Sequence, residues 1–256
     1  MAAMARSRRP DPRQGVFETL LVLDGRPVEL DAHLARLEAS LAELFPDRPT
    51  PAIEDEVHAR SATLKCGVLR VTVAPGQGSG LRVHIAIREA RVEFVPDSET
   101  NSTQGPAGLR SFVLEEGLGA FKWADRSLLD QAQARLPDHT LPLIVDAGGA
   151  VLEASRANLF AVRDGALFTP PLDGRILAGV TRGRVLEIAA GAAIEAHESV
   201  LDRDDLLAAE EVFLTGSVRG IEPVASLDGE TLPGGRPLTE QLAAELRRAW
   251  LGAPVA

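Results

Sequence analysis

Apolar and polar residues along the first third of the chain predict two β-hairpins and a helix between them. Residues 15–23 (GVFETLLVL) and 26–30 (RPVEL) flank Asp24-Gly25, a pair that tolerates the positive φ angles of a two-residue turn. Leucines then recur at three- and four-residue steps, which predicts a helix capped by Asp31 and ended by Pro46. Strands are predicted again at 67–75 and 81–89, joined by GQGSG. Because no helix follows this glycine-rich run, we interpret it as a turn rather than a dinucleotide-binding loop.

The remaining pattern predicts a second, larger domain. Residues 95–108 (VPDSETNSTQGPAG) are polar and lack periodicity, which is typical of a linker. After it the pattern predicts a strand, a short helix, three or four short strands within 141–171, a helix at 179–193, a strand at 211–216 and a final helix at 237–251. Helices and strands mix without strict alternation, which favours an α+β fold. We therefore predict an irregular segment at 1–14, a small α+β domain at 15–107 and a large domain at 108–256.

Composition and charge exclude several classes of protein. With 256 residues, 45% of them hydrophobic, the chain is long and apolar enough for a globular core. Its net charge of −10 argues against binding to nucleic acid or to an anionic membrane surface. A single cysteine cannot form an internal disulfide, the histidines are too scattered for a metal site, and no run is long enough for a signal peptide or a membrane span. These features predict a cytoplasmic protein without a metal.

Six short segments carry residues suited to chemistry: GVFET (15–19), HLARL (33–37), FKWADR (121–126), LEASRANLF (152–160), ILAGVTR (176–182) and LTGSVRGIEPV (214–224). Lys122, one of only two lysines in the chain, lies between two aromatic residues that can shield its amine from water. Gly179 and Thr181 open a predicted helix, whose first N–H groups suit an anion. Each feature also has a purely structural interpretation, as a surface lysine or as a helix cap.

Taken together and in this order, the segments resemble the fold-type IV pyridoxal-phosphate enzymes. This family includes branched-chain aminotransferases, D-amino acid aminotransferases and 4-amino-4-deoxychorismate lyases. The resemblance extends from Gly15 to Val224. It implies a two-domain α+β fold like that of the D-amino acid aminotransferases, pyridoxal 5'-phosphate as cofactor, a small anionic amine as substrate, and a homodimer.

The resemblance also implies a role for particular residues. Lys122 matches the lysine that forms the Schiff base, and Glu153 matches the acidic partner of the pyridine nitrogen. Leu177 falls where the family packs a leucine against the ring, and Arg70 matches an arginine that binds substrate carboxylates in the aminotransferases. The implied phosphate site draws on three segments of the chain: Arg36, Val180, Thr181 and Ser217.

Thr19 bears most directly on the choice of reaction. Branched-chain aminotransferases usually have glycine at this position, whereas the lyases resemble this chain in having a threonine, whose hydroxyl can protonate a departing enolpyruvate. The chain contains no tyrosine, although branched-chain aminotransferases line their pockets with tyrosines, and Arg126 also resembles the lyases. Thr19 has a simpler interpretation as a β-branched strand residue. Phe121 and Asp125 depart from the pattern common among the lyases.

These features predict a lyase that converts 4-amino-4-deoxychorismate to 4-aminobenzoate and pyruvate, a step toward folate. In this reaction Lys122 and Thr19 would be the catalytic residues. Two alternatives stay open, because both share every cofactor residue. One is a class IV aminotransferase for D-amino or branched-chain amino acids. The other is a protein that binds pyridoxal phosphate without turnover, or a partner of a chorismate-modifying enzyme.

Overall fold

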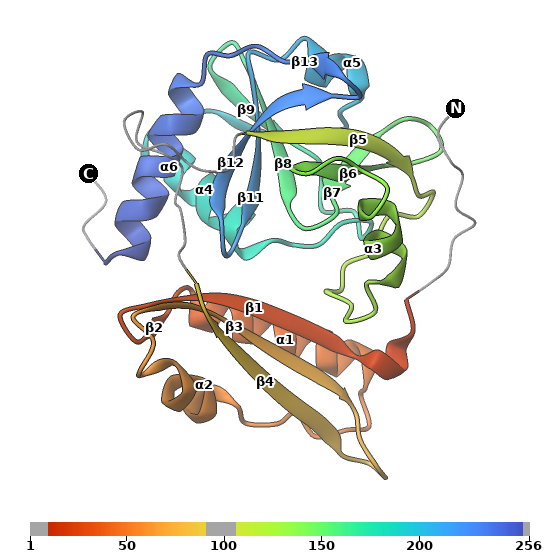
Figure 1. The fold of residues 1–256 in the computed structure, drawn as a ribbon, viewed down its shortest axis with the longest axis vertical. Coiled ribbons are helices and arrows are strands. Elements are labelled where there is room, and N and C mark those ends of the chain that lie inside the picture. The colour runs from red at the N-terminus through yellow and green to blue at the C-terminus, as the bar shows by residue number, and fades with distance from the viewer. Residues whose placement is uncertain (1–9, 91–105, 253–256) are drawn as a thin grey trace. The chain divides into compact units, whose positions relative to one another are not determined.

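The structure is a computed structural model that describes residues 10–90 and 106–252. These residues form two compact units, both coloured along the chain in Figure 1. The N-terminal unit comprises residues 10–90 together with Phe121–Arg126, and the C-terminal unit comprises residues 106–120 and 127–252. Each unit mixes helices with strands, so the predicted α+β class is confirmed.

The N-terminal unit is built on a small antiparallel sheet. Its elements are η1 (Pro12–Gln14), β1 (Val16–Leu23), β2 (Arg26–Pro27), α1 (Leu30–Leu44), α2 (Glu54–Ser61), β3 (Cys66–Pro75) and β4 (Leu81–Glu89). Within the described residues the sheet has four strands in the order β2-β1-β3-β4. Both predicted hairpins are confirmed. Asp24 and Gly25 have φ angles of 46° and 77°, as a tight hairpin turn requires.

Helix α1 covers one face of this sheet and buries its leucines there. Leu37 and Leu41 of α1 belong to the same buried cluster as alternate residues of β1, which include Leu20. The prediction that Asp31 caps the helix is wrong. The helix begins one residue earlier, at Leu30, and its N-cap is Glu29, whose φ of 53° is left-handed. The reason is that the chain already turns at Glu29 as it leaves β2, which places Asp31 inside the first turn.

The segment Phe121–Arg126 belongs to the N-terminal unit, although the sequence alone assigned it to the large domain. Trp123 forms an isolated antiparallel bridge with Val16 of β1, and both Phe121 and Trp123 pack against the core beneath α1. Of the predicted linker, residues 95–105 lie outside the described residues. Ala107 already belongs to the first strand of the C-terminal unit.

The C-terminal unit contains a larger mixed sheet with helices packed on it. Its elements are β5 (Ala107–Val113), α3 (Ser127–Gln133), β6 (Thr140–Val145), β7 (Val151–Ala154), β8 (Asn158–Arg163), β9 (Ala166–Thr169), α4 (Val180–Gly191), β10 (Ala196–Glu198), α5 (Arg203–Leu207), β11 (Glu211–Gly216), β12 (Gly220–Leu227), β13 (Glu230–Thr231) and α6 (Pro237–Trp250). Among the described residues the sheet has nine strands in the order β10-β9-β8-β11-β12-β5-β6-β7, with β13 paired to β12. Four strands, β6 to β9, form where three or four were predicted.

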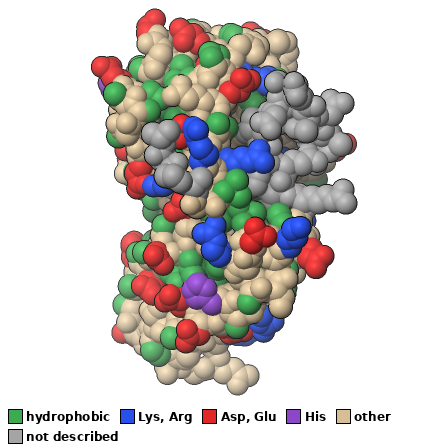
Figure 2. All heavy atoms as spheres, turned by 90° about the vertical axis from the view of Figure 1, so that its left-hand side faces the viewer, with side chains coloured by type: hydrophobic (Ala, Val, Ile, Leu, Met, Phe, Trp, Pro, Cys, Tyr) green, Lys and Arg blue, Asp and Glu red, His purple; other side chains and the backbone are tan. Residues whose placement is uncertain are grey.

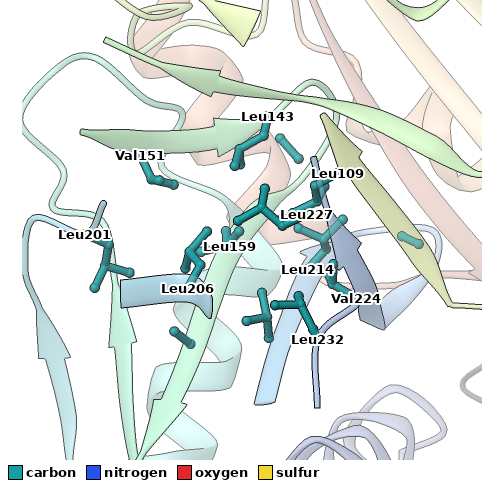
Figure 3. Packing of buried hydrophobic residues seen from close by; sticks show 14 of the residues in the cluster. Leu109, Leu143, Val151, Leu159, Leu201, Leu206, Leu214, Val224, Leu227 and Leu232 are labelled. Carbon is teal, nitrogen blue, oxygen red and sulfur yellow. The ribbon is translucent and has the colours of Figure 1, made fainter. Parts of the chain in front are cut away.

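Successive side chains of β11 pack on opposite faces of the large sheet. Leu214 points into the aliphatic cluster shown in Figure 3, together with Leu159 and Leu227. Phe213, its neighbour, faces the other side and stacks on its cross-strand partner Phe160, with ring centroids 5.1 Å apart. Helices α4 and α6 lie side by side and contact β11. Thr215 lies on the same face of β11 as Phe213.

The surface carries both signs of charge. On the face shown in Figure 2, acidic side chains are spread over the described residues and basic side chains lie among them. A search of residues 10–90 and 106–252 finds no helix with the length and apolar character needed to cross a membrane.

Candidate active site

The residues singled out from the sequence fall into two groups, one in each unit. Thr19, Arg36, Arg70 and Lys122 belong to the N-terminal unit. The second group lies in the C-terminal unit: Glu153, Leu177, Val180, Thr181 and Ser217.

Phe17 brings Lys122 and Arg70 together. The Arg70 guanidinium carbon lies 3.7 Å from the centroid of the Phe17 ring, and Lys122 Nζ lies 5.1 Å from it. Both cations are therefore within the range of a cation–π contact with the same ring. Thr19 is the direct cross-strand partner of Arg70 and lies two residues beyond Phe17, so the side chains of Phe17, Thr19 and Arg70 share one face of the sheet. The sheet thus gathers three of the predicted residues around a ring that the sequence analysis did not single out.

The backbone of β1 holds the segment that carries Lys122. The N–H of Phe17 donates to the carbonyl oxygen of Lys122 at 2.9 Å, and the N–H of Ala124 donates to that of Gly15 at 2.9 Å. The rings of Phe121 and Trp123 meet edge to face at 5.4 Å and pack against the core of the unit. The two aromatic residues next to the lysine therefore anchor its segment.

Arg36 binds Glu18, a residue that the sequence analysis did not assign to the site. Arg36 Nε donates to Glu18 Oε1 at 2.8 Å, and Arg36 Nη2 donates to Oε2 at 2.6 Å. His33 Nδ1 lies 2.8 Å from Glu18 Oε2. Burial alone would raise the pKa of the Glu18 carboxyl, but hydrogen bonds from His33 and Arg36 outweigh burial and lower that pKa to about 2. The one signal in the sequence is a carboxylate within an otherwise apolar strand.

In the C-terminal unit, Asn158 and the backbone of Leu177 surround the Glu153 carboxylate. Glu153 lies in β7 and is 5% exposed. Asn158 Nδ2 donates to Glu153 Oε2 at 3.3 Å and to the carbonyl oxygen of Leu177 at 2.9 Å, while the Leu177 N–H lies 3.4 Å from both Glu153 oxygens. This arrangement links the candidate partner of the pyridine nitrogen to the residue predicted to cover the ring.

Donors suited to an oxyanion gather at the start of α4. Gly179 is the N-cap, and no side chain among the described residues caps the helix, whose first N–H groups have no partner inside it. Thr181 is buried, and its hydroxyl lies 3.5 Å from that of Ser217, the residue directly after β11. The buried Thr215 hydroxyl, two residues before Ser217, has no hydrogen-bond partner within the described part of the chain. Uncapped amides, paired hydroxyls and an unsatisfied hydroxyl together fit a bound phosphate.

The α4 start leaves no room for a side chain at position 179. A Cβ built on Gly179 would lie 1.9 Å from Asn158 Oδ1 and 3.3 Å from Arg182 Cβ. Only glycine lets the N-terminus of α4 approach Asn158 this closely.

Across the described residues there is no group of three or more histidine, cysteine, aspartate or glutamate side chains that could hold a metal ion.

Comparison with known proteins identifies the class of enzyme. The model of the class IV aminotransferases matches residues 15–227, and the chain belongs to this family. Enzymes of the family use pyridoxal phosphate as their cofactor. The chain is therefore a pyridoxal-phosphate enzyme of the aminotransferase or lyase type, as the sequence predicted.

The proteins that this chain resembles include both a lyase and aminotransferases. The chain is 31% identical to the 4-amino-4-deoxychorismate lyase of Pseudomonas aeruginosa, with a TM-score of 0.76 and coverage of 96% of this chain and 95% of that structure. It is 25% identical to a hypothetical aminotransferase of Mycobacterium tuberculosis solved with pyridoxal phosphate bound, with a TM-score of 0.77 and coverage of 93% and 89%. It is also 39% identical over 118 residues to the branched-chain-amino-acid aminotransferase of Escherichia coli. That match spans 45% of this chain and 38% of the relative's length.

Proposed function

We propose that this enzyme is a lyase that converts 4-amino-4-deoxychorismate into 4-aminobenzoate and pyruvate. The observation that carries the proposal is the position of Thr19. Its cross-strand partner is Arg70, and it shares a sheet face with Phe17, the ring next to Lys122 Nζ. A hydroxyl, a cation for a carboxylate and an amine therefore lie on one surface. The lyase of Pseudomonas aeruginosa, similar along nearly the whole chain, supports the same choice.

The residues of the C-terminal unit would hold the cofactor. Thr181, Ser217 and the N–H groups from Val180 onward would bind its phosphate. The cation would be Arg36 of the N-terminal unit, as the family resemblance implies. Glu153 would keep the pyridine nitrogen protonated, since an ionised carboxylate accepts that N–H. Leu177 would cover the ring. When bound, pyridoxal phosphate supplies an electron sink for a substrate carbon that bears an amine.

The N-terminal unit would supply the acid, the base and the grip on the substrate. Lys122 Nζ would bind the cofactor and, once the substrate amine has replaced it, remove the proton from the carbon that bears the amine. The ether bond to the enolpyruvyl group would then break, the Thr19 hydroxyl would donate a proton to the departing oxygen, and the proton that Lys122 removed would restore the hydroxyl. Arg70 would hold a substrate carboxylate. The products, 4-aminobenzoate and pyruvate, account for every atom of the substrate, so no oxidant is needed.

The decisive experiment supplies the purified enzyme, loaded with pyridoxal phosphate, with chorismate, glutamine and a chorismate-aminating enzyme. We expect equal amounts of 4-aminobenzoate and pyruvate, detected by chromatography and by a coupled pyruvate assay. A reaction without this enzyme is the control. Absence of 4-aminobenzoate, together with ready transamination of leucine or D-alanine, would overturn the proposal.

An aminotransferase is the second candidate, because the match to the branched-chain enzyme of Escherichia coli reaches 39% identity over 118 residues. It would use the same lysine and the same phosphate site, and the two candidates differ only in what becomes of the substrate. In either case we propose a homodimer. Size-exclusion chromatography with light scattering tests this expectation.

A further inference from the structure

Glu18 is a buried carboxylate on the core side of β1. Its nearest neighbours on the same face of the strand, Val16 and Leu20, belong to the apolar cluster beneath α1. Glu18 itself is 2% exposed. A carboxylate in such surroundings is costly unless it is both paired and hydrogen-bonded. An apolar residue would pack there without the cost of burying a charge, which indicates that the carboxylate does more than fill space.

Its partners come from one flank of α1. His33 and Arg36 are three residues apart, a spacing that places both on the same side of a helix. Because hydrogen bonds from both residues keep Glu18 ionised, its oxygens only accept, and His33 Nδ1 must be the atom that carries the proton. Glu18 Oε2 thus accepts from His33 and from Arg36 Nη2, while Oε1 accepts from Arg36 Nε.

The contact between Glu18 and Arg36 is bidentate. It engages the Nε edge of the planar guanidinium at 2.8 Å and 2.6 Å. Two parallel hydrogen bonds fix the plane of the group as well as its position.

We propose that Glu18 is a positioning residue, which fixes the plane of the Arg36 guanidinium for its role as the cation that binds the phosphate of the cofactor. This inference rests on the proposed function, in which Arg36 is the cation of the phosphate site. His33 supports the same geometry through Glu18 Oε2.

Glu18 could affect phosphate binding through its charge or through its orientation of Arg36. These two explanations predict opposite changes in phosphate affinity when Glu18 is replaced, so an experiment can separate them. Glu18 is an anion next to Arg36. Replacing it with a neutral residue leaves the site more positive, and charge alone would then tighten phosphate binding. If Glu18 acts by orientation, the same replacement weakens phosphate binding although the repelling charge is gone.

The experiment measures how much the phosphate group adds to cofactor affinity. Apoenzyme is titrated with pyridoxal phosphate and separately with pyridoxal, which lacks the phosphate, and the ratio of the two dissociation constants is the phosphate preference. We expect Glu18→Gln to lower this preference about tenfold or more while the affinity for pyridoxal stays within about twofold, since a misaligned charged hydrogen bond loses most of its strength. The phosphorus NMR signal of the bound cofactor should shift in the same variant.

Two further variants keep the test decisive. Arg36→Lys retains the charge but cannot form the bidentate contact, so it should lower the preference as much as Glu18→Gln does. If Glu18→Gln fails to fold, Arg36→Lys still tests whether the bidentate contact is needed for phosphate binding. Glu211→Gln is the matched control. Glu211 is likewise buried, and it accepts from the N–H groups of Leu238 and Thr239 at the start of α6, so its loss should reduce stability without changing the phosphate preference.

The outcomes separate this inference from the proposed function. If Arg36→Ala lowers the preference but Glu18→Gln and Arg36→Lys leave it unchanged or raise it, Glu18 does not position Arg36 and the inference is overturned alone. If Arg36→Ala leaves the preference unchanged, the proposed role of Arg36 fails, and the positioning role of Glu18 fails with it. A loss of preference in all three variants, with Glu211→Gln unaffected, supports both.

Discussion

Asn158 occupies the space that a side chain at position 179 would need. Its Oδ1 atom lies 1.9 Å from the point where a Cβ on Gly179 would be, while its Nδ2 atom donates to Glu153 and to the carbonyl oxygen of Leu177. One amide therefore connects the start of α4 to the candidate partner of the pyridine nitrogen. A change at position 179 would be transmitted to Glu153 through this contact.

We expect Gly179→Ala to weaken binding of pyridoxal phosphate by about 10- to 100-fold, because displacing Asn158 leaves buried polar groups without partners. Titration of the apoenzyme, followed by absorbance, measures the effect. Gly183→Ala, in the same helix, is the matched control, since nothing lies within 4 Å of a Cβ there. That change should leave affinity unaltered and raise stability by up to about 1 kcal/mol. Equal behaviour of the two variants would contradict the steric argument.

Lys122→Ala should abolish both the visible absorbance of the cofactor-loaded enzyme and its activity, because the chain would lose the amine that bonds to the cofactor. Borohydride reduction of the wild-type enzyme, followed by peptide mass spectrometry, should find the cofactor on residue 122. Lys65→Ala is the control, since Lys65 is the other of the two lysines. Label on Lys65 would show that the Schiff base lies elsewhere.

Glu153→Gln should keep the cofactor but lower turnover by about 10²-fold or more, because a neutral amide does not hold the proton on the pyridine nitrogen. Turnover and cofactor content are measured on the same preparation. Glu222→Gln, which removes a carboxylate paired with Arg219 elsewhere in the same unit, should leave turnover near the wild-type value. A Glu153→Gln enzyme with normal turnover would rule Glu153 out as the ring partner.

Thr19→Val tests the step that distinguishes a lyase from an aminotransferase. Valine is nearly isosteric and equally suited to a strand, so folding and cofactor binding should persist. Pyruvate release should fall by about 10²-fold or somewhat less, since a general acid contributes about 10²–10⁴-fold and Lys122 can donate in its place. Thr72→Val removes a hydroxyl from the cross-strand partner of Phe17 and is the control. Unchanged pyruvate release would show that Thr19 is only a strand residue.

Glu18 should make the N-terminal unit sensitive to acid. Its pKa is about 2 in the folded protein against an ordinary 4.5. A folded-state pKa below the unfolded one means that the carboxylate stabilises the fold fully above pH 4.5 and loses this effect as the pH falls toward 2. The whole effect corresponds to roughly 3 kcal/mol. Glu18→Gln should flatten this part of the stability curve.

Tryptophan fluorescence can assign that loss to the correct unit. Trp123 packs in the N-terminal unit and Trp250 in the C-terminal unit, and the chain has no other tryptophan. In a Trp250→Phe background, urea unfolding between pH 6 and pH 3 therefore reports on Trp123. If the Trp250→Phe variant that retains Glu18 has the same free energy of unfolding at every pH from 6 to 3, the lowered pKa of Glu18 is contradicted.

Local pattern was enough to predict most elements of both units. The Asp24-Gly25 turn follows from backbone chemistry confined to two residues, and the strand at 211–216 has the bounds predicted for it. The six ordered segments likewise predicted the enzyme family. Such features depend on residues that are close in sequence.

Long-range contacts account for what the pattern missed. Lys122 was assigned to the large domain because its neighbours in sequence belong there, yet a main-chain hydrogen bond from Phe17 ties it to β1. Glu18 went unassigned because its partners lie 15 and 18 residues further along the chain. That the Thr215 hydroxyl lacks a partner among residues 10–90 and 106–252 depends on the packing around it. No local periodicity encodes these relationships.

The hold of β1 on the lysine segment has an evolutionary consequence. The bonds from Phe17 N–H to Lys122 and from Ala124 N–H to Gly15 join main-chain atoms, which every substitution except proline preserves. Side chains around the amine can therefore diverge while the lysine keeps its place on the strand. A lineage could exchange one substrate for another by changing its pocket residues, without having to reinvent the reactive group.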